Sequence, residues 1–295
     1  MKSIKIKSPA KINLGLRVVG KRDDGYHDIE TIFQMVSLYD DIKLTESEEE
    51  IILYTNNNTI PSDEKNLAYK AAQLLRKKKG IKRGVKIEIY KNIPVSAGLG
   101  GGSSNAAATL LGLNYLWDLK LSNVELSPLA RHLGADVPFF LSGPRALGTE
   151  RGDKLQILPV TNKFYVILLN PRLSISTEWV YKNLKLELTK SRKNINMKKF
   201  ISERSDIENI KDILFNDLES VVMEKYNIIV RMKDVLLSAG ALGSLMSGSG
   251  STVFGLFKDY SSAEQAGKMI KGEEWSLFLV ETLTSLDKYP WEVIV

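Results

Sequence analysis

The strongest candidate for chemistry in this sequence is a glycine-rich run between Gly98 and Ala108. It holds four glycines, two serines and three alanines within eleven residues. Glycines let the main chain approach a ligand closely and reach positive φ angles. Successive backbone N–H groups, with the positive end of a helix expected to begin at Ser103, can then hold a di- or triphosphate. The simpler alternative is a flexible turn with a serine N-cap, which rarely gathers so many small residues.

A lysine and an asparagine stand two residues apart near the N-terminus, in a segment that alternates like a half-buried strand. This alternation places Lys11 and Asn13 on the face opposite Ile12 and Leu14. One ammonium beside one amide can serve a reacting hydroxyl or a phosphate. Taken alone, the pair is equally compatible with an exposed lysine on an edge strand.

Asp136 is the third candidate, a lone acid between Gly134 and the apolar residues 137–140, where we expect a strand to start. Carboxylates are seldom placed among apolar residues unless they are paired or functional. The alternative is an aspartate that caps or forms a turn. A fourth segment, Gly-Ser-rich over 246–251, predicts a hairpin turn whose small residues suit contact with a ligand or with another glycine-rich loop.

Two rival phosphate motifs fail. Residues 15–21 match the Walker A spacing up to Lys21, but Arg22 stands where a Ser or Thr must hold magnesium. The same residues lie in a strand-like alternation, where no cradle loop forms. A dinucleotide-binding fingerprint requires glycine at position 103, which is serine.

The elements around these motifs predict an α+β fold of two domains, residues 1–155 and 156–295. In the first half we expect strands over 11–18, 29–38, 41–45, 51–55 and 85–90, and helices over 66–79 and from 103. In the second half we expect strands over 164–169, 242–246, 253–257 and 277–281, and helices over 215–239 and 263–271. Residues 182–209, rich in Lys, Asn, Glu and Ser, predict a mobile insertion or an irregular helical stretch.

Composition narrows the class of protein. The 295 residues are 43% hydrophobic and 26% charged, which is typical of a soluble globular protein. Cysteine is absent, so disulfides and thiolate metal sites are excluded. No signal peptide or membrane span is recognisable, and we expect a cytoplasmic protein. The net charge of +6 is spread over the sequence, which favours a solubilising surface or attraction of phosphate-rich anions over nucleic-acid binding.

Taken in order, these segments resemble the GHMP kinases, the family of galactokinase, homoserine, mevalonate and phosphomevalonate kinases. The resemblance covers roughly residues 5–257. The motifs that carry it are Ser8-Pro-Ala-Lys-Ile-Asn-Leu, Arg22-Asp-Asp-Gly-Tyr-His, Gly98-Leu-Gly-Gly-Gly-Ser-Ser-Asn-Ala-Ala, Gly134-Ala-Asp-Val-Pro and Met246-Ser-Gly-Ser-Gly.

The resemblance implies a role for each matched residue. Asp136 matches the general base, and Lys11 matches the lysine that assists it. Positions near a cytidine-bearing substrate are matched by Asn13, Tyr26, His27, Thr177 and Tyr181. The implied ATP-binding loop consists of Pro94, Val95, Ser96, Ala97, Gly98, Leu99, Gly100, Gly101, Gly102, Ser103 and Ser104.

The resemblance also implies a fold and a reaction. The expected fold is an N-terminal domain like domain 2 of ribosomal protein S5 and a ferredoxin-like C-terminal domain. The expected reaction is phosphorylation, by ATP with Mg²⁺, of the 2-hydroxyl of a cytidine diphosphate-linked methylerythritol. No residue is assigned to the metal, and the protein is expected to be a monomer or a homodimer.

Three alternatives stay open at this point. A homoserine or mevalonate-type kinase shares the family, but residues 24–27 argue against it because those substrates carry no base to stack. A nucleotide-binding sensor without catalysis would have lost Lys11 or Asp136. An RNA-binding domain would follow from the S5-like fold alone, which is a poor guide to function.

Overall fold

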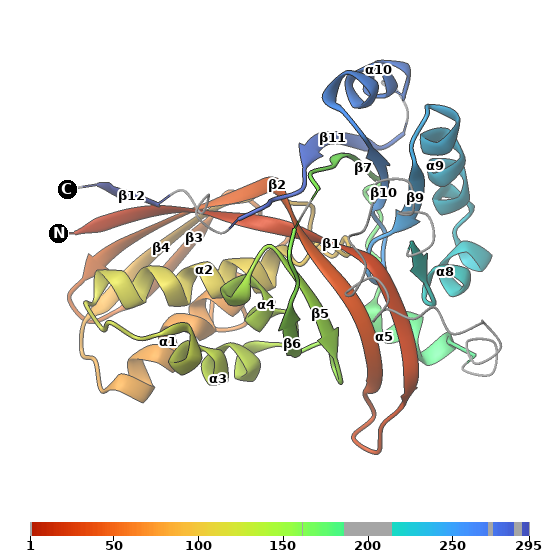
Figure 1. Ribbon diagram of the computed structural model, residues 1–295. Coiled ribbons are helices and arrows are strands. Elements are labelled where there is room, and N and C mark those ends of the chain that lie inside the picture. The colour runs from red at the N-terminus through yellow and green to blue at the C-terminus, as the bar shows by residue number, and fades with distance from the viewer. Residues whose placement is uncertain (1, 161, 186–213, 271–273, 286–290, 295) are drawn as a thin grey trace.

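A computed structural model describes residues 2–160, 162–185, 214–270, 274–285 and 291–294. Two β-sheets stand side by side, each with helices packed on it (Figure 1). The α+β class expected from the sequence is confirmed. Most of the predicted insertion, residues 186–209, lies outside the described residues.

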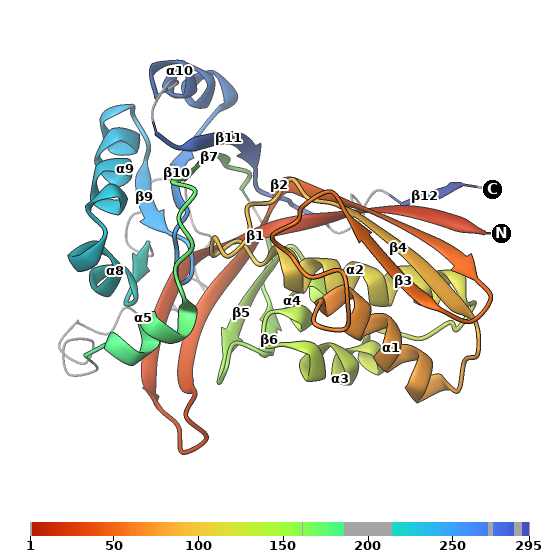
Figure 2. The same ribbon diagram turned by 180° about the vertical axis from the view of Figure 1, so that it is seen from behind.

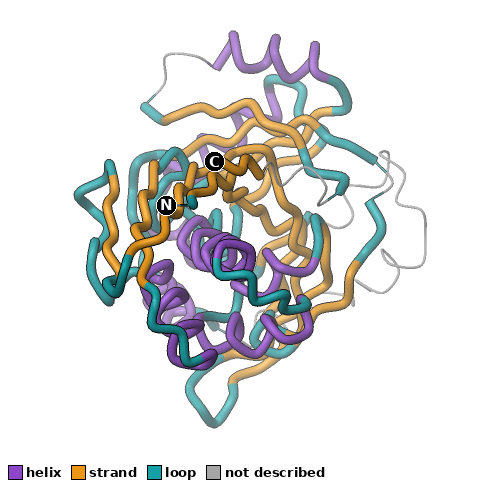
Figure 3. Tube along the Cα trace, turned by 90° about the vertical axis from the view of Figure 1, so that its left-hand side faces the viewer, coloured by secondary structure: helices purple, strands orange, loops and turns teal. Residues whose placement is uncertain are grey.

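The larger sheet has the strand order β12-β1-β2-β4-β3, with β5 on β2, β6 on β5 and a short β8 parallel to β1. Helices α1, α2, α3 and α4 pack on one face of it (Figure 3). The strands are β1 (Ser3–Lys21), β2 (His27–Ser47), β3 (Ile51–Thr55), β4 (Gly84–Tyr90), β5 (Arg145–Thr149), β6 (Lys154–Ile157), β8 (Phe215–Asn216) and β12 (Trp291–Ile294). The helices are α1 (Leu67–Lys79), α2 (Gly101–Leu116), α3 (Asn123–Leu133) and α4 (Val137–Ser142).

Local chemistry sets the two ends of α1. The side chain of Asn66 accepts a hydrogen bond from the backbone N–H of Ala68 and caps the first turn. Gly80 ends the helix at φ 64°, a left-handed conformation that glycine adopts without strain. The predicted span of 66–79 is therefore confirmed.

Helix α2 begins at Gly101, two residues before the expected start, and is buried on nearly all sides rather than along one face. Its run of alanines lets it lie close beneath the sheet. At Gly112 an added Cβ would lie 2.5 Å from the Cδ1 atoms of Ile6 and Leu44, so these side chains would have to shift to admit a larger residue. This close packing fixes the position of the helix N-terminus relative to β1.

Strand β1 is buried on both faces in its central part, so the expected half-buried strand is wrong. The side of Ile12 and Leu14 packs against strands of the second sheet, while Lys11 and Asn13 are only 4% and 2% exposed. A register shift between Pro9 and Ala10 interrupts the pairing of β1 with β2. Such irregularities re-aim the side chains that follow.

The smaller sheet is antiparallel with the order β11-β7-β10-β9, which is the β-α-β-β-α-β arrangement of a ferredoxin-like fold. Its four strands match the predicted ones within two residues. The elements are β7 (Tyr165–Asn170), α5 (Thr177–Asn183), α8 (Glu219–Lys225), α9 (Asn227–Ser238), β9 (Gly243–Met246), β10 (Val253–Phe257), α10 (Tyr260–Ile270) and β11 (Ser276–Glu281).

The single helix predicted over 215–239 is wrong. Residues 215–216 form β8, and two helices follow that are separated at Tyr226. Tyr226 leaves the helical conformation at φ −124° and ψ 85°, and its N–H closes α8 on Val222. Its ring packs edge-on against Trp179 of α5, a tertiary contact that periodicity does not reveal.

The larger sheet contains strands from both halves of the chain, which bears on the predicted division into domains. The division predicted after residue 155 falls inside β6, while β8 and β12 bring later residues back to β1. The two chain ends therefore lie together at one end of the molecule (Figure 2). Domains of 1–155 and 156–295 stay a prediction.

Candidate active site

A cleft of about 1310 Å³ opens between the two sheets. Pockets for one small ligand typically measure about 300–1,000 Å³, so this cleft can accept two. The larger-sheet side contributes residues of β1, the β1–β2 turn, the glycine-rich loop and the segment before α4. The smaller-sheet side contributes residues 175–178 and 181–182 and the Gly-Ser turn 248–250.

The glycine-rich loop needs its glycines at two positions. Gly98 and Gly100 have φ angles of 77° and 69°. A Cβ on Gly98 would lie 2.0 Å from the backbone oxygen of Ser247, so the loop and the Gly-Ser turn are in direct contact. The Ser247 hydroxyl donates to the Gly98 carbonyl at 2.9 Å. Of the two roles considered for the turn, contact with another glycine-rich loop is confirmed.

Most of the predicted ATP loop lines the cleft, from Pro94 to Ser103. Leu99 and Ser104 are the exceptions, since they are 1% and 0% exposed. The Ser104 hydroxyl accepts a hydrogen bond from Ser8 at 2.7 Å and is directed into the core. Only Ser103 of the two serines therefore has a hydroxyl available to a phosphate or a metal ion.

Lys11 and Asp136 meet in the cleft, although they are far apart in the sequence. The Lys11 ammonium lies 3.6 Å from a carboxylate oxygen of Asp136. It also donates to the side-chain oxygen of Asn13 at 2.6 Å, and the Asn13 amide donates to Thr31 at 2.8 Å. The buried ammonium is thus held by two side chains, so the alternative of an exposed edge-strand lysine is excluded.

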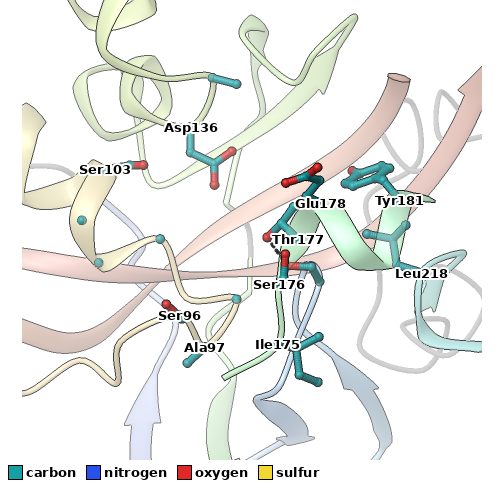
Figure 4. A pocket seen from close by; sticks show the side chains of 18 of the residues that line it. Ser96, Ala97, Ser103, Asp136, Ile175, Ser176, Thr177, Glu178, Tyr181 and Leu218 are labelled. Carbon is teal, nitrogen blue, oxygen red and sulfur yellow. Dashed lines mark hydrogen bonds between the residues drawn. The ribbon is translucent and has the colours of Figure 1, made fainter. Parts of the chain in front are cut away.

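Asp136 precedes a helix rather than the expected strand. Pro138 lies in the first turn of α4, where its fixed φ and missing N–H suit a helix start. Asp136 occupies the N-cap position, yet its side chain makes no capping hydrogen bond. Instead the carboxylate lies between Ser103 at the start of α2 and the α5 residues Thr177 and Glu178 (Figure 4). Capping therefore does not account for this residue.

The buried position of Lys11 predicts how activity depends on pH. Burial lowers the pKa of the Lys11 ammonium from its ordinary 10.5, and the neighbouring Asp136 opposes the shift without cancelling it. We expect kcat to fall on the alkaline side as Lys11 loses its proton. In a kcat–pH profile, Lys11→Arg should move this alkaline fall in kcat to higher pH, because a guanidinium stays charged.

The lowered pKa of Lys11 affects stability in the opposite direction from activity. Between the lowered folded pKa and the unfolded value of 10.5, the unfolded chain binds more protons at Lys11 than the folded chain does. The contribution of this group to the free energy of unfolding therefore rises with pH while activity falls. If the alkaline fall in kcat occurred at the same pH in Lys11→Arg as in wild type, deprotonation of Lys11 would not be its cause.

Aromatic and cationic side chains form the wall around the predicted substrate positions. The His27 and Tyr181 rings are stacked, with centroids 4.9 Å apart. The Arg151 guanidinium lies 4.0 Å above the Tyr26 ring, and Tyr26 is 55% exposed. Burial, with a smaller effect of Lys21, lowers the pKa of His27 and favours its neutral form. Burial, reinforced by Asp136, raises the pKa of Tyr181.

Several residues of the site carried no sequence signal. Arg151 lies in a turn after β5, and its Nε is buried without a hydrogen-bond partner beside the cleft. Asn216 donates to the Met246 and Gly248 carbonyls and shapes the Gly-Ser turn. Asn216 acts beside a contact between two predicted segments, in which Thr177 of α5 and Ser249 of the same turn share a hydrogen bond at 2.8 Å. Only long-range packing brings these side chains together.

A glycine-rich loop at a helix start, facing a lysine–carboxylate pair in a cleft between an S5-like and a ferredoxin-like region, defines a class of small-molecule kinase. Residues 66–144 match the family model described as the GHMP kinases N terminal domain, and residues 197–276 match the GHMP kinases C terminal model. The chain belongs to the GHMP kinases and is an ATP-using enzyme.

Within that family, curated relatives of high similarity are named 4-diphosphocytidyl-2-C-methyl-D-erythritol kinase. The protein of that name from Syntrophotalea carbinolica is 45% identical over 93% of this chain and 97% of its own length. The protein of that name from Clostridioides difficile is 47% identical over 89% of this chain and 90% of its own.

Solved structures of GHMP kinases show the same fold. A crystal structure of 4-(cytidine 5'-diphospho)-2C-methyl-D-erythritol kinase has a TM-score of 0.80 at 32% identity and covers 94% of this chain and 98% of its own. A homoserine kinase from Cytophaga hutchinsonii has a TM-score of 0.78 at 21% identity over 99% and 97% of the two chains, a likeness of fold alone. Within the described residues, none of the helices has the length and apolar character that crossing a membrane requires.

Proposed function

We propose that this kinase transfers the γ-phosphoryl group of ATP to the 2-hydroxyl of 4-diphosphocytidyl-2-C-methyl-D-erythritol, a step of non-mevalonate isoprenoid biosynthesis. The observation that carries the proposal is the Lys11–Asp136 pair, 3.6 Å apart in a cleft with the glycine-rich loop on one side and aromatic residues on the other. A catalytically silent nucleotide sensor would have no need of such a pair.

Asp136 is the general base of the proposed reaction. Its carboxylate is partly exposed to the cleft, with 34% of the side chain accessible, so an incoming hydroxyl can reach it. It takes the proton of the 2-hydroxyl as the oxygen attacks the γ-phosphorus and the bond to the β-phosphate oxygen breaks. Lys11, whose ammonium lies 3.6 Å from the carboxylate, offsets the negative charge that develops on the transferred group.

The side-chain amide of Asn13 can form hydrogen bonds with Lys11 and with the substrate at the same time. A primary amide offers two N–H donors and two acceptor positions. Lys11 takes one acceptor position of Asn13 and Thr31 takes one N–H, which leaves one of each. We assign the remaining positions to a hydroxyl of the substrate.

The phosphates of ATP belong at the loop and the start of α2. The backbone N–H groups of residues 98–103 and the positive end of the α2 dipole suit a triphosphate. Ile60, Pro61 and Leu67, which line the same end of the cleft, provide an apolar surface for the adenine. A magnesium ion bound to the phosphates would supply charge neutralisation. The described residues contain no cluster of three or more carboxylate or histidine side chains that could hold it, so Ser103 and water are its candidate ligands.

The opposite wall suits a cytidine diphosphate. We place the cytosine between the rings of Tyr26 and Tyr181, where it displaces His27 or Arg151 from the ring face that each now covers. A neutral His27 can both donate and accept along the polar edge of the base. The Arg151 guanidinium, next to this position, is suited to the diphosphate.

Replacement of Tyr26 with alanine should raise KM for the cytidine substrate by about 5- to 150-fold. Loss of base stacking costs about 1–3 kcal/mol, which corresponds to that range. Steady-state kinetics should show KM for ATP almost unchanged, because ATP lies at the loop. The melting temperature should also be unchanged, since Tyr26 is 55% exposed.

Tyr54 offers a matched control. It is 54% exposed on β3, outside the residues that line the cleft, and the Lys86 ammonium lies 5.1 Å from its ring centroid. Tyr54→Ala should change neither KM. Equal increases of both KM values in a destabilised Tyr26→Ala protein would instead assign Tyr26 a packing role.

The function itself is tested by a coupled ADP-release assay with three acceptors side by side: the cytidine substrate, homoserine and mevalonate. We expect ADP release with the cytidine substrate and a phosphomonoester at its 2-position by phosphorus NMR. Turnover of homoserine or mevalonate at a comparable kcat/KM would overturn the proposed substrate while leaving the kinase chemistry intact.

A further inference from the structure

A carboxylate that is not part of the cleft lies beneath the glycine-rich loop. Asp40 of β2 is 0% exposed. One of its oxygens accepts from the backbone N–H groups of Asn92 at 2.8 Å and Ile93 at 2.9 Å. The other accepts from the side-chain amide of Asn105 at 2.9 Å and from the Lys91 ammonium.

These partners stand at both ends of the loop. Asn92 and Ile93 immediately precede residues 94–104, and Asn105 immediately follows them. A single buried group therefore joins the entry and the exit of the loop. The contact continues to β1, because the Asn105 amide also donates to the Ser8 hydroxyl at 3.1 Å.

A carboxylate suits this position because all four of its partners are donors. An ionised aspartate only accepts, and its two oxygens offer about four acceptor positions. A buried charge is tolerated when it is paired and hydrogen-bonded, as Asp40 is by Lys91 and the amides. An amide in its place would direct an NH₂ group at Lys91 and Asn105, which are themselves donors.

We propose that Asp40 is a positioning residue for nucleotide binding, which holds the loop and the first turn of α2 in the shape that receives the phosphates. It touches neither substrate, since it does not line the cleft. The proposal rests on the proposed function in one respect, that the loop binds ATP.

The test compares binding of the two substrates. In Asp40→Asn, we expect Kd for a non-hydrolysable ATP analogue and KM for ATP to rise at least about tenfold, the loss expected when charged hydrogen bonds are broken. Kd for the cytidine substrate, measured alone by calorimetry, should stay within about twofold of wild type. A general loss of packing would weaken binding of both substrates rather than binding of the ATP analogue alone.

A compensating exchange tests the mechanism. Combining Asp40→Asn with Asn105→Asp returns a carboxylate to the reach of Lys91, whose ammonium lies 3.4 Å from the Asn105 side-chain oxygen. The amide at position 40 can still accept from Asn92 and Ile93 and can donate to the new carboxylate. We expect the double variant to bind the ATP analogue within about threefold of wild type, a coupling that independent sites do not show.

A control at the other end of the same helix separates this effect from general destabilisation. Asn114 of α2 holds the backbone of Leu121 by two hydrogen bonds. Asn114→Ala should lower the melting temperature without changing affinity for the ATP analogue.

Unchanged analogue affinity in folded Asp40→Asn would overturn the proposal, as would a folded double variant that remains weak. If Asp40→Asn does not fold, the affinity of the double variant for the ATP analogue is the test of the proposal. A wild-type protein that binds the analogue but does not phosphorylate the cytidine substrate would contradict the proposed function and leave the role of Asp40 measurable.

Discussion

Replacement of Asp136 with asparagine should lower kcat by about 10²–10⁴ while ATP affinity stays within a few-fold of wild type. Removal of a general base typically has an effect of this size. Asparagine keeps the shape of the side chain at the start of α4 but cannot take the proton. Since the Asp136 side chain makes no capping hydrogen bond, the substitution should not disturb α4.

The measurement is steady-state kinetics with the cytidine substrate, together with calorimetry of a non-hydrolysable ATP analogue. Glu178 provides the comparison, because it is the carboxylate on the α5 side of the cleft. Glu178→Gln should keep kcat within about threefold of wild type. If Asp136→Asn kept kcat within about threefold and Glu178→Gln lost it, the base would have to be reassigned.

Replacement of Gly98 with alanine should weaken ATP binding by more than about 100-fold. The added Cβ would lie 2.0 Å from the Ser247 backbone oxygen, and the residue has a φ of 77°. Neither constraint can be relieved by a side-chain rotation, so the loop or the Gly-Ser turn must move. A misplacement of about 1 Å can lower a reaction rate by about 10²-fold, and we expect a comparable loss of ATP affinity when the phosphate loop is displaced.

Gly80→Ala is the control that separates displacement of the glycine-rich loop from the strain of a positive φ angle. It also has a positive φ, 64°, but a Cβ there meets nothing within 4 Å. Gly80→Ala should lower stability by about 1 kcal/mol and leave affinity for the ATP analogue unchanged. Equal nucleotide affinity in folded Gly98→Ala and Gly80→Ala would show that the loop is not the phosphate site.

The sequence by itself determined the local structure and the kind of chemistry. The helix predicted over 66–79 is confirmed, because the Asn66 cap and the Gly80 stop that set its ends each act within one turn of the chain. The glycine-rich run and its serines predicted a phosphate loop, since the required backbone freedom belongs to glycine itself. The order of the motifs was sufficient for the family, which the relatives confirm.

The tertiary structure decided which residues meet. Simple alternation would put Ser8 and Lys11 on opposite faces of β1, but the shift after Pro9 turns both toward α2. The pairing of Lys11 with Asp136, the stacking of His27 on Tyr181 and the contact of Arg151 with Tyr26 join segments that local rules treat separately.

Asp40 shows the same distinction most plainly. In the sequence it is the first of two adjacent aspartates, in the short gap between the strands predicted over 29–38 and 41–45, and no feature marks it as a site residue. Its four donors come from the segment that follows β4 and from helix α2. A buried charge persists only where distant segments converge to satisfy it, and that convergence arises from packing of the whole chain rather than from any local pattern.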